Sequence, residues 1–385
     1  MRISLIGPVY PYRGGIAHHT MLLAQHLGDR HAVQVISFRR QYPRWLFGGR
    51  SDRDPSLRPL RTDAEYLLDP LDPITWWKVA RRVAAWRPDA LILPWWVTFW
   101  SPAWLALSHL VHRWTDARVL FVCHNVLPHE GNAIDRMLAR SVLSQGDAIL
   151  VQSQQGLALV KELVPNRRNA WVPHPSYAEL GVRENGEANQ LSQAAARARL
   201  GLNLPPGQPV LLHFGFIRPY KGLSILFDAM PLIQTQMPVH LLVAGEVWGS
   251  KAEYDAQIAR LHIGAQVTFA DRYVPDEELA SYFLAADVAV LPYLSATQSG
   301  VVQLAFGFGL PVIASNVGGL PDVIREGETG LLVPPGDASA LAEAVIRFFR
   351  SGLGPSMTTN IIANQARFSW ERMVTTIEGL LTETR

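Results

Sequence analysis

Residues 1–38 read MRISLIGPVYPYRGGIAHHTMLLAQHLGDRHAVQVISF. Residues 2–6 form a short apolar run, and residues 33–38 form a second run that is rich in β-branched side chains. Between them lies a glycine-containing loop, and residues 16–27 then repeat apolar side chains at helical spacing. A strand, a loop, a helix and a second strand in this order predict the repeating unit of a parallel α/β sheet.

The same unit recurs along the rest of the chain. Two further strands are expected in the first half, at residues 119–123 and 148–152, and each ends in polar residues. A polar stretch at residues 181–208 interrupts the pattern and reads as an exposed linker that leads into a helix. A second series of strands and helices follows, at residues 209–214, 222–230, 240–244, 266–269, 276–286, 288–291, 311–314 and 338–349. The sequence therefore predicts two doubly wound α/β halves with a ligand-binding cleft between them.

Composition narrows the class of protein. The chain has 385 residues, of which 48% are hydrophobic and 18% charged, which excludes a disordered, coiled-coil or collagen-like protein. A single cysteine, Cys123, allows no intrachain disulfide framework and suits a reducing compartment. Residues 90–112 lack charged side chains and are long enough to span a membrane. Their prolines and polar residues favour instead a buried strand, a loop and a helix that starts at Pro102.

Basic and aromatic residues are unevenly distributed. Residues 1–180 hold 21 Lys and Arg against 14 Asp and Glu, and they hold ten of the twelve Trp residues. Residues 41–50, QYPRWLFGGR, interleave Arg44 and Arg50 with Trp45 and other large apolar side chains. This pattern predicts peripheral contact with an anionic membrane. The alternative is a Trp-rich core with solvated arginines, in which the stretch covers the groove of a soluble acceptor.

Two motifs in the second half indicate an anion. In HFGFIRPYKG, at residues 213–222, Arg218 and Lys221 lie on a short loop between a strand and a helix, where they could hold a diphosphate. The alternative is a solvated basic loop. In YLSATQSGVVQLAFGFG, at residues 293–309, a strand is followed by small and polar residues that open a helix and leave backbone N–H groups for an anion. These residues are Thr297, Gln298, Ser299 and Gly300, and by themselves they could be a simple helix cap.

The first half carries weaker signals. Gly14 and Gly15 would let a ligand approach the backbone, although no dinucleotide-binding G-x-G-x-x-G is present. His124 follows a predicted strand and could transfer a proton or bond a sugar hydroxyl, or it could be a structural histidine. The D-x-D at residues 52–54 lacks a preceding apolar strand, and we expect no metal site.

Together these motifs resemble glycosyltransferase family 4, whose members have the GT-B fold. The resemblance rests on the GGI loop, the His after a strand, GFIRPYKG, and a run from TQSGV through FG-x-PVIASNVGGLPDVI. It implies an α/β protein with two doubly wound Rossmann-like domains facing a cleft. The implied domains are an acceptor-side domain at 1–180, a linker at 181–208, a nucleotide-sugar domain at 209–365 and a terminal helix at 366–385 that crosses back.

The resemblance also implies an activity. Such enzymes are metal-independent, need no cofactor, and transfer a sugar from a nucleotide diphosphate sugar with retention of the anomeric configuration. The acceptor would be a saccharide or a lipid-linked saccharide, as in polysaccharide or glycolipid synthesis, and no nucleic acid is expected. The protein would be cytoplasmic, with peripheral contact at the inner face of the membrane. The implied catalytic residues are His124, Arg218 and Lys221, and the implied donor-binding residues are Gly14, Gly15, Glu246, Tyr273, Val274, Thr297, Gln298, Ser299, Gly300 and Gln303.

One departure from the family pattern bears on activity. The family commonly has two glutamates eight positions apart in the nucleotide-sugar loop, where this chain has Ser295 and Gln303. Gln303 can still bond ribose hydroxyls, but Ser295 cannot replace a carboxylate that orients the donor sugar. Two alternatives to an active transferase therefore stay open, namely an inactive sugar-nucleotide-binding protein and a GT-B sugar-nucleotide epimerase.

Overall fold

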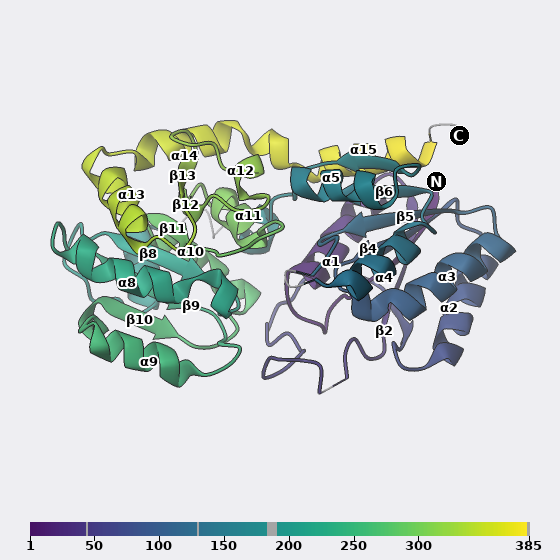
Figure 1. The fold of residues 1–385 in the computed structure, drawn as a ribbon, viewed down its shortest axis with the longest axis horizontal. Helices are drawn as coiled ribbons and strands as arrows, with labels where there is room; N and C mark the ends of the chain where they lie inside the picture. Colours follow the sequence, from purple (N-terminus) through teal and green to yellow (C-terminus); the bar gives the residue numbers. More distant parts are fainter. Residues whose placement is uncertain (44, 129–130, 183–190, 383–385) are drawn as a thin grey trace. The chain divides into compact units, whose positions relative to one another are not determined.

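The computed structural model describes residues 1–43, 45–128, 131–182 and 191–382, and the chain divides into two compact units. Unit 1 consists of Met1–Asp54, Pro59–His174 and Ser369–Arg385, and unit 2 of Pro55–Arg58 and Pro175–Phe368. Each unit is built around its own parallel sheet, as Figure 1 shows.

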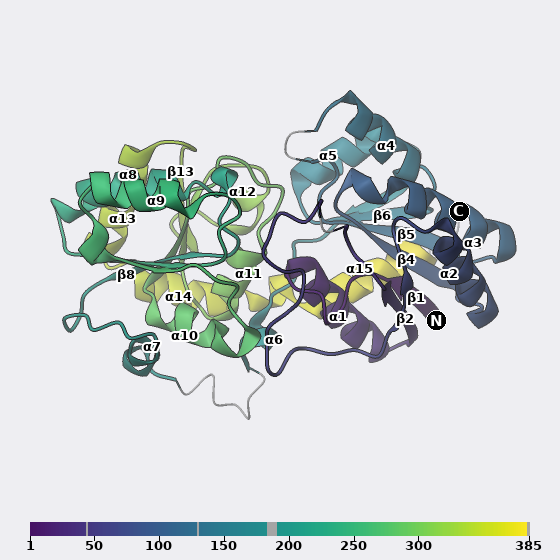
Figure 2. The ribbon, with the colours of Figure 1, turned by 90° about the horizontal axis from the view of Figure 1, so that it is seen from below.

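Unit 1 contains a seven-stranded sheet in the order β3-β2-β1-β4-β5-β6-β7. Its elements are β1 (Arg2–Ile6), α1 (Gly15–Gly28), β2 (Ala32–Phe38), β3 (Glu65–Leu68), α2 (Pro73–Trp86), β4 (Ala90–Trp95), η1 (Thr98–Trp100), α3 (Ser101–Trp114), β5 (Arg118–Cys123), α4 (Ala133–Leu143), β6 (Ala148–Val151), α5 (Gln154–Leu163), β7 (Arg168–Trp171) and α15 (Trp370–Thr382). Helix α1 packs against α15 on one face, whereas α2, α3, α4 and α5 contact one another in order on the other face (Figure 2). The strand order therefore reverses between β1 and β4.

Unit 2 repeats this plan with six strands in the order β10-β9-β8-β11-β12-β13. Its elements are α6 (Ala178–Val182), α7 (Gln193–Arg199), β8 (Val210–Phe214), η3 (Pro219–Lys221), α8 (Leu223–Gln234), β9 (His240–Ala244), α9 (Lys251–Arg260), η4 (Gly264–Gln266), β10 (Val267–Ala270), η5 (Asp276–Glu278), α10 (Leu279–Ala285), β11 (Val288–Leu291), α11 (Gly300–Gly307), β12 (Val312–Ser315), α12 (Leu320–Val323), β13 (Gly330–Val333), α13 (Ala338–Arg350), α14 (Gly354–Ala363) and η6 (Gln365–Phe368). Helix α8 packs against α9 and α13, and α10 packs against α6 and α7 (Figure 2). Here the strand order reverses between β8 and β11.

Local sequence explains these elements. The central strands are apolar runs buried along their whole length, as expected when helices cover both faces of a parallel sheet. Several helices begin at side-chain caps, such as Asp72, whose carboxylate accepts from the Ile74 N–H at 3.1 Å just before Pro73. Ser153 caps α5 in the same way, since its hydroxyl accepts from the Gly156 N–H at 3.0 Å.

Several sequence predictions can be compared with these elements. The strand, loop and helix expected across residues 90–112 are confirmed as β4, η1 and α3. Among the described helices, none combines the length and the apolar character that crossing a bilayer requires. The helix predicted at 222–230 instead runs from Leu223 to Gln234 and passes through Pro231. It continues because its last turn buries Ile233 in the core of unit 2.

Other elements were split or not predicted. The helix expected at 276–286 is a 3₁₀ turn, η5, followed by α10. The pattern also did not reveal three strands, β3, β7 and β13, or seven helices, α2, α4, α5, α6, α9, α12 and α14. The predicted linker is only partly exposed: residues 183–190 lie outside the described residues, but α7 packs against α10. Arg197 on α7 donates to Asp287 Oδ2 and to the Ala285 carbonyl, both at 2.9 Å.

The last helix, α15, belongs to unit 1 although its sequence follows unit 2. Trp370 at its start is buried, stacks on His26 at 5.5 Å between ring centroids and contacts His19. Arg30 pairs with both Glu371 and Glu378, and His31 Nε2 lies 2.9 Å from Glu378 Oε1. One aromatic anchor and a row of ion pairs therefore attach α15 to α1.

Candidate functional site

The loop after β8 is held against the loop after β11. Gly222 has φ +69°, and a Cβ atom there would lie 1.8 Å from the Pro292 carbonyl oxygen. The Leu294 N–H donates to the Tyr220 carbonyl at 2.8 Å. Because β8 and β11 flank the reversal of strand order in unit 2, this contact lies where doubly wound sheets bind ligands.

Arg218 and Lys221, here called the cation pair, lie on this loop over aromatic rings. The Arg218 guanidinium carbon is 4.8 Å from the Trp248 ring centroid, and Lys221 Nζ is 3.8 Å from that of Tyr293. Both also lie over Tyr220, at 5.4 and 5.5 Å. Among the described residues, neither cation forms an ion pair with a carboxylate. The positive charge of the loop is therefore uncompensated.

A neutral imidazole, that of His213, lies near Lys221. Burial, with a smaller effect of the Arg218 charge, lowers the pKa of the Lys221 amine. His213, at the end of β8, is fully buried, and its Nδ1–H donates to the Val290 carbonyl at 3.0 Å. The pKa of His213 is lowered to about 4, mainly by burial and to a smaller extent by the charge of Lys221. His213 is therefore neutral near pH 7, so the positive charge at this loop comes from the cation pair.

The start of α11 lies beside the same loop. A Cβ atom on Gly215 would approach the Val301 side chain at 3.2 Å. Ser299 caps the helix, since its hydroxyl accepts from the Val302 N–H at 3.4 Å, and Gly300 is the first helical residue. Gln298 Oε1 and Gln303 Oε1 are buried and have no hydrogen-bond partner in the part of the chain that the structure describes. The cation pair and two unpaired amide oxygens thus come from neighbouring strand ends.

An aromatic surface borders the cation pair. The Phe216 ring lies 5.0 Å from that of Trp248 and 5.9 Å from that of Tyr273, between centroids. Glu246 is buried at the end of β9, and its carbonyl accepts from the Ile217 N–H at 2.9 Å. Val274 is also buried, so only Tyr273 of the predicted pair at 273–274 joins this surface by a ring contact. Neither Phe216 nor Trp248 was predicted as a site residue from the sequence, although both closely follow predicted strands.

In unit 1, His124 belongs to a buried histidine cluster, defined here as His19, His124 and His174. The His19 ring lies 4.6 Å from that of His124 and 5.3 Å from that of His174, edge to face in both cases. Gln152 Nε2 lies 2.9 Å from His19 Nε2. Of the three, only His124 was predicted from the sequence, because His19 on α1 and His174 after β7 meet it only in the folded unit.

Two members of the histidine cluster, His19 and His124, are uncharged. Burial, and secondarily the neighbouring His174, lower the pKa of His124 to about 3. The same causes, with His124 as a further neighbour, lower the pKa of His19 well below its usual value. His124 Nε2 is buried without a hydrogen-bond partner among the described residues. Neutral imidazoles can donate or accept a hydrogen bond, but they cannot supply the charge that an anion requires.

The glycine loop and the D-x-D differ in character. Gly14 has φ +101°, a left-handed conformation that favours glycine, and α1 begins at Gly15. Asp54 is buried, with Oδ2 at 3.8 Å from His18 Nε2, and Asp52 pairs with Arg53 at 3.5 Å. These carboxylates therefore face cationic or titratable neighbours within unit 1.

The basic loop has one clearly exposed aromatic side chain. Trp45 is 78% exposed and Leu46 is 42% exposed, whereas Arg44 lies outside the described residues. Two nearby arginines, Arg39 and Arg40, pair with Asp69, so part of the basic character is neutralised. Helix α2 adds a second exposed apolar set that the sequence analysis did not identify, with Ile74 63% and Trp77 45% exposed.

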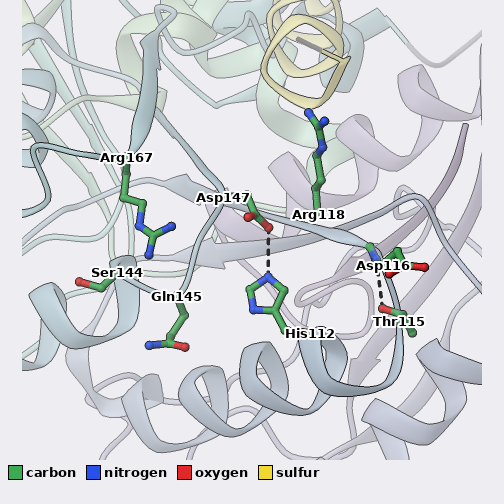
Figure 3. Close-up of a pocket in the computed structure, with 9 residues that line it drawn as sticks. His112, Thr115, Asp116, Arg118, Ser144, Gln145, Asp147 and Arg167 are labelled. Atoms are coloured by element: carbon green, nitrogen blue, oxygen red, sulfur yellow. Dashed lines mark hydrogen bonds and ion pairs between the residues drawn. The ribbon is translucent and has the colours of Figure 1, made fainter. Parts of the chain in front are cut away.

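A polar cavity of about 600 Å³ lies at the opposite edge of the unit 1 sheet, next to the amino ends of β5 and β6 (Figure 3). His112 Nε2 lies 3.0 Å from Asp147 Oδ2, and Arg118 donates to the Leu381 carbonyl at 2.6 Å. Figure 3 shows the Arg118 side chain extending toward α15. The described lining of this cavity includes none of the residues that the sequence predicted for a site. The two contacts attach α3 and α15 to the sheet.

Comparison with known proteins identifies the class. Residues 14–175 match the family described as Glycosyl transferase 4-like domain, and residues 208–351 match Glycosyl transferases group 1. Sucrose-phosphate synthase from Thermosynechococcus elongatus is similar in structure, with a TM-score of 0.74, 23% identity and 98% of each chain covered. HepE from Anabaena, in complex with UDP and glucose, has a TM-score of 0.73, 18% identity and 99% coverage of each chain. The protein thus has the α/β GT-B fold of glycosyltransferases.

Sequence relatives point to the same family. The chain is 35% identical over 293 residues to a D-inositol 3-phosphate glycosyltransferase of Rhodococcus erythropolis, covering 72% of this chain and 62% of the relative. It is 31% identical over 290 residues to that of Nocardia farcinica, covering 71% and 60%. The matched region spans about half the length of the curated relatives, from 41% to 62%. The chain belongs to the group 1 glycosyltransferases with a family 4-like first domain, as the sequence motifs predicted.

Proposed function

We propose that this protein is a retaining, metal-independent glycosyltransferase. It transfers a hexose from a nucleotide diphosphate sugar to a saccharide or lipid-linked acceptor. The observation that best supports the proposal is the cation pair, which has no acidic partner within the described part of the chain. It lies next to β8 and β11, where the strand order of unit 2 reverses. A diphosphate is the leaving group of a nucleotide sugar, and two uncompensated cations are suited to bind it.

The cation pair would act on the leaving group. As the bond to the sugar breaks, negative charge develops on the departing phosphate, and preorganised cations stabilise this charge more in the transition state than in the ground state. Arg218 offers a planar fork of N–H donors, and Lys221 offers a compact ammonium. We expect the backbone N–H groups at residues 297–300 to contribute to the same phosphates.

The remaining predicted residues would position the sugar and the nucleoside. His124, which is neutral and has an unpaired Nε2 in the described structure, can bond a sugar hydroxyl. Glu246, Tyr273 and Val274 would lie near the base or ribose, where Tyr273 joins an aromatic surface. Gly14 and Gly15 would let the donor approach the backbone.

A donor panel tests the proposal. UDP-glucose is the first candidate, since HepE has been crystallised with it, and GDP-, dTDP- and ADP-linked sugars complete the panel. We expect one donor to raise the melting temperature and to be consumed when acceptor is added. The product anomer should match that of the donor, and EDTA should leave the rate unchanged. An inverted product or a strict need for Mn²⁺ or Mg²⁺ would contradict retention or metal independence, respectively.

A second candidate function is nucleotide-sugar binding without transfer. It is favoured by Ser295 and Gln303, which stand where the family commonly has glutamates, and Gln303 is buried with an unpaired Oε1 in the described residues. Donor hydrolysis in the absence of acceptor separates the two candidates. A protein that binds the donor tightly but neither hydrolyses nor transfers it is a binding protein, and one that interconverts sugar epimers is an epimerase.

We also propose peripheral contact between unit 1 and anionic membranes, with a lipid-linked acceptor. The exposed side chains of Trp45 and Leu46 support this, as do Ile74 and Trp77 on α2. Trp favours the headgroup level of a bilayer, and each nearby basic residue contributes roughly 1 kcal/mol at an anionic surface. The protein should sediment with anionic but not neutral vesicles, and high salt should release it.

The loop at residues 41–50 can be tested separately. The triple change Arg44→Glu, Trp45→Ala and Arg50→Glu should weaken sedimentation without altering donor binding. Replacing Trp77 by Ala tests the contribution of α2 in the same assay. Sedimentation that the triple change does not affect would exclude the loop, and a protein that binds no vesicles at low salt would favour a soluble acceptor.

A further inference from the structure

Lys221 is held by an aromatic ring instead of a carboxylate. Its Nζ lies 3.8 Å from the centroid of Tyr293, closer than the other cation of the pair lies to either of its rings. Tyr293 is fully buried, and Lys221 is half-buried. A ring face attracts a cation through its quadrupole, and the attraction is strongest where water is excluded.

The choice of a ring has a chemical consequence. A carboxylate beside Lys221 would neutralise it and would compete with an incoming phosphate. A ring stabilises the ammonium without cancelling its charge, because the ring carries no net charge. The neighbouring His213 is neutral as well, with its Nδ1–H committed to the Val290 carbonyl. The ammonium is thus fixed in place while its full charge stays available.

We propose that Tyr293 is a positioning residue that seats Lys221 for the diphosphate of the donor. The inference rests on the proposed function for its ligand, but the seat itself is a property of the ligand-free protein. The position of Tyr293 favours this role, because it follows β11 directly and the neighbouring backbone is tied to the Lys221 loop by the Leu294 to Tyr220 hydrogen bond. Ring and amine therefore come from the two strand ends that meet at the reversal of strand order.

The first test uses the ligand-free protein. Lysine is labelled with ¹³C, the Lys221 resonance is assigned by its loss in Lys221→Ala, and the amine is titrated by NMR. In Tyr293→Leu the amine should titrate at clearly lower pH than in the wild type, because the charged form loses the ring. Tyr293→Phe keeps the ring and should titrate like the wild type. An unchanged titration in Tyr293→Leu would overturn the seat, whatever the protein does with nucleotides.

The second test measures binding of inorganic pyrophosphate by calorimetry. We expect Tyr293→Leu to raise Kd about 5- to 30-fold and Tyr293→Phe to change it less than twofold. Tyr254→Leu removes a partly buried tyrosine of α9 that packs against Phe227 elsewhere in unit 2. It serves as the control and should bind normally. Melting curves of each variant report whether it is folded.

A double-mutant cycle separates seating from general packing. If Tyr293 acts through Lys221, then Tyr293→Leu should weaken pyrophosphate binding no further in a Lys221→Ala background. Additive losses would overturn the inference, as would a Tyr293→Phe variant that is as impaired as Tyr293→Leu. A wild type that shows the NMR shift and binds pyrophosphate but no nucleotide sugar would contradict the proposed function while leaving the seat intact.

Discussion

Units 1 and 2 have the same doubly wound plan, yet they gather different chemistry at the carboxyl ends of their strands. Unit 2 presents the cation pair on aromatic rings, with no carboxylate paired to it in the described residues. Unit 1 contains the buried histidine cluster instead. Within it, the lowered pKa values of His19 and His124 keep these two side chains neutral. One site is suited to a charged leaving group, and the other to hydrogen bonds with uncharged hydroxyl groups. A shared topology therefore fixes where ligands bind but not what they are.

The loops of the two units are also joined differently. In unit 2, the glycines bring backbone against backbone, since Cβ atoms on Gly222 and Gly245 would each lie 1.8 Å from a carbonyl oxygen. In unit 1, the nearest atoms to a Cβ on Gly7 belong to the Thr20 side chain, at 2.8 Å. The unit 2 site therefore depends on a backbone contact that no rotamer change can relieve.

The largest effect is expected from a substitution that disrupts the backbone contact at Gly222. Gly222→Ala combines a left-handed φ with a clash against the Pro292 carbonyl, and it should cost about 2–5 kcal/mol of unfolding free energy. Gly327→Ala is the control, because Gly327 has φ +76° but nothing within 4 Å of a Cβ, so only about 1–2 kcal/mol is expected. Urea denaturation measures both. Equal losses in the two variants would show that the loop contact contributes little.

The next effect concerns charge in unit 2. Lys221→Ala and Arg218→Ala should each lose about 2–4 kcal/mol of transition-state stabilisation, which is roughly 30- to 1000-fold in turnover at saturating donor. The control is Lys251→Ala, which removes a half-buried lysine that pairs with Asp255 on α9. Near-normal turnover in both cation variants would mean that the diphosphate is bound elsewhere.

A smaller effect concerns neutrality in unit 1. His124, with a folded pKa of about 3, stays neutral in the folded state while the unfolded chain gains a proton below pH 6.5. Burial of His124 therefore does not lower the free energy of unfolding above about pH 6.5. The free energy of unfolding then decreases as the pH falls from there toward the folded pKa. Between pH 7 and pH 5, His124 should lower the free energy of unfolding by about 2 kcal/mol. His124→Gln should remove that part of the pH dependence.

Denaturation curves at the two pH values check this prediction. Exposed His109→Gln is the control and should leave the pH dependence as in the wild type. His213, in unit 2, has a folded pKa of about 4 and should keep contributing in the His124 variant. If His124→Gln has the same pH dependence as the wild type, the imidazole takes up its proton over the same pH range in the folded and unfolded states. Unit 1 would then not differ from unit 2 in the way inferred.

The smallest effect sharpens the comparison within the cation pair. Arg218 is exposed and lies over Trp248, so this ring should matter less than the buried Tyr293. Trp248→Leu should weaken pyrophosphate binding about 2- to 5-fold, and Trp248→Phe should retain most of the binding. An effect larger than that of Tyr293→Leu would show that Trp248 supports the site through more than the guanidinium contact.

The sequence alone predicted much of the fold. Strand and helix patterns depend on residues close along the chain, so apolar runs and helical spacing revealed most central elements of both sheets. Failures occurred where tertiary contacts override local signals. Pro231 does not end α8, because Ile233 is buried beyond it, and α7 is packed by Arg197 although its sequence looks like a linker.

The sequence also determined the family and the cation pair, because Arg218 and Lys221 belong to one short motif with a recognisable order. It could not determine that Tyr293 lies beneath Lys221, or that the His19 ring contacts those of His124 and His174. Those contacts join segments far apart in the chain, and only the order of strands brings the segments together. The charge states of His19, His124 and His213 were decided there too, because burial and the neighbouring groups lower the pKa of each. Neither burial nor the neighbouring groups can be read from a local run of residues.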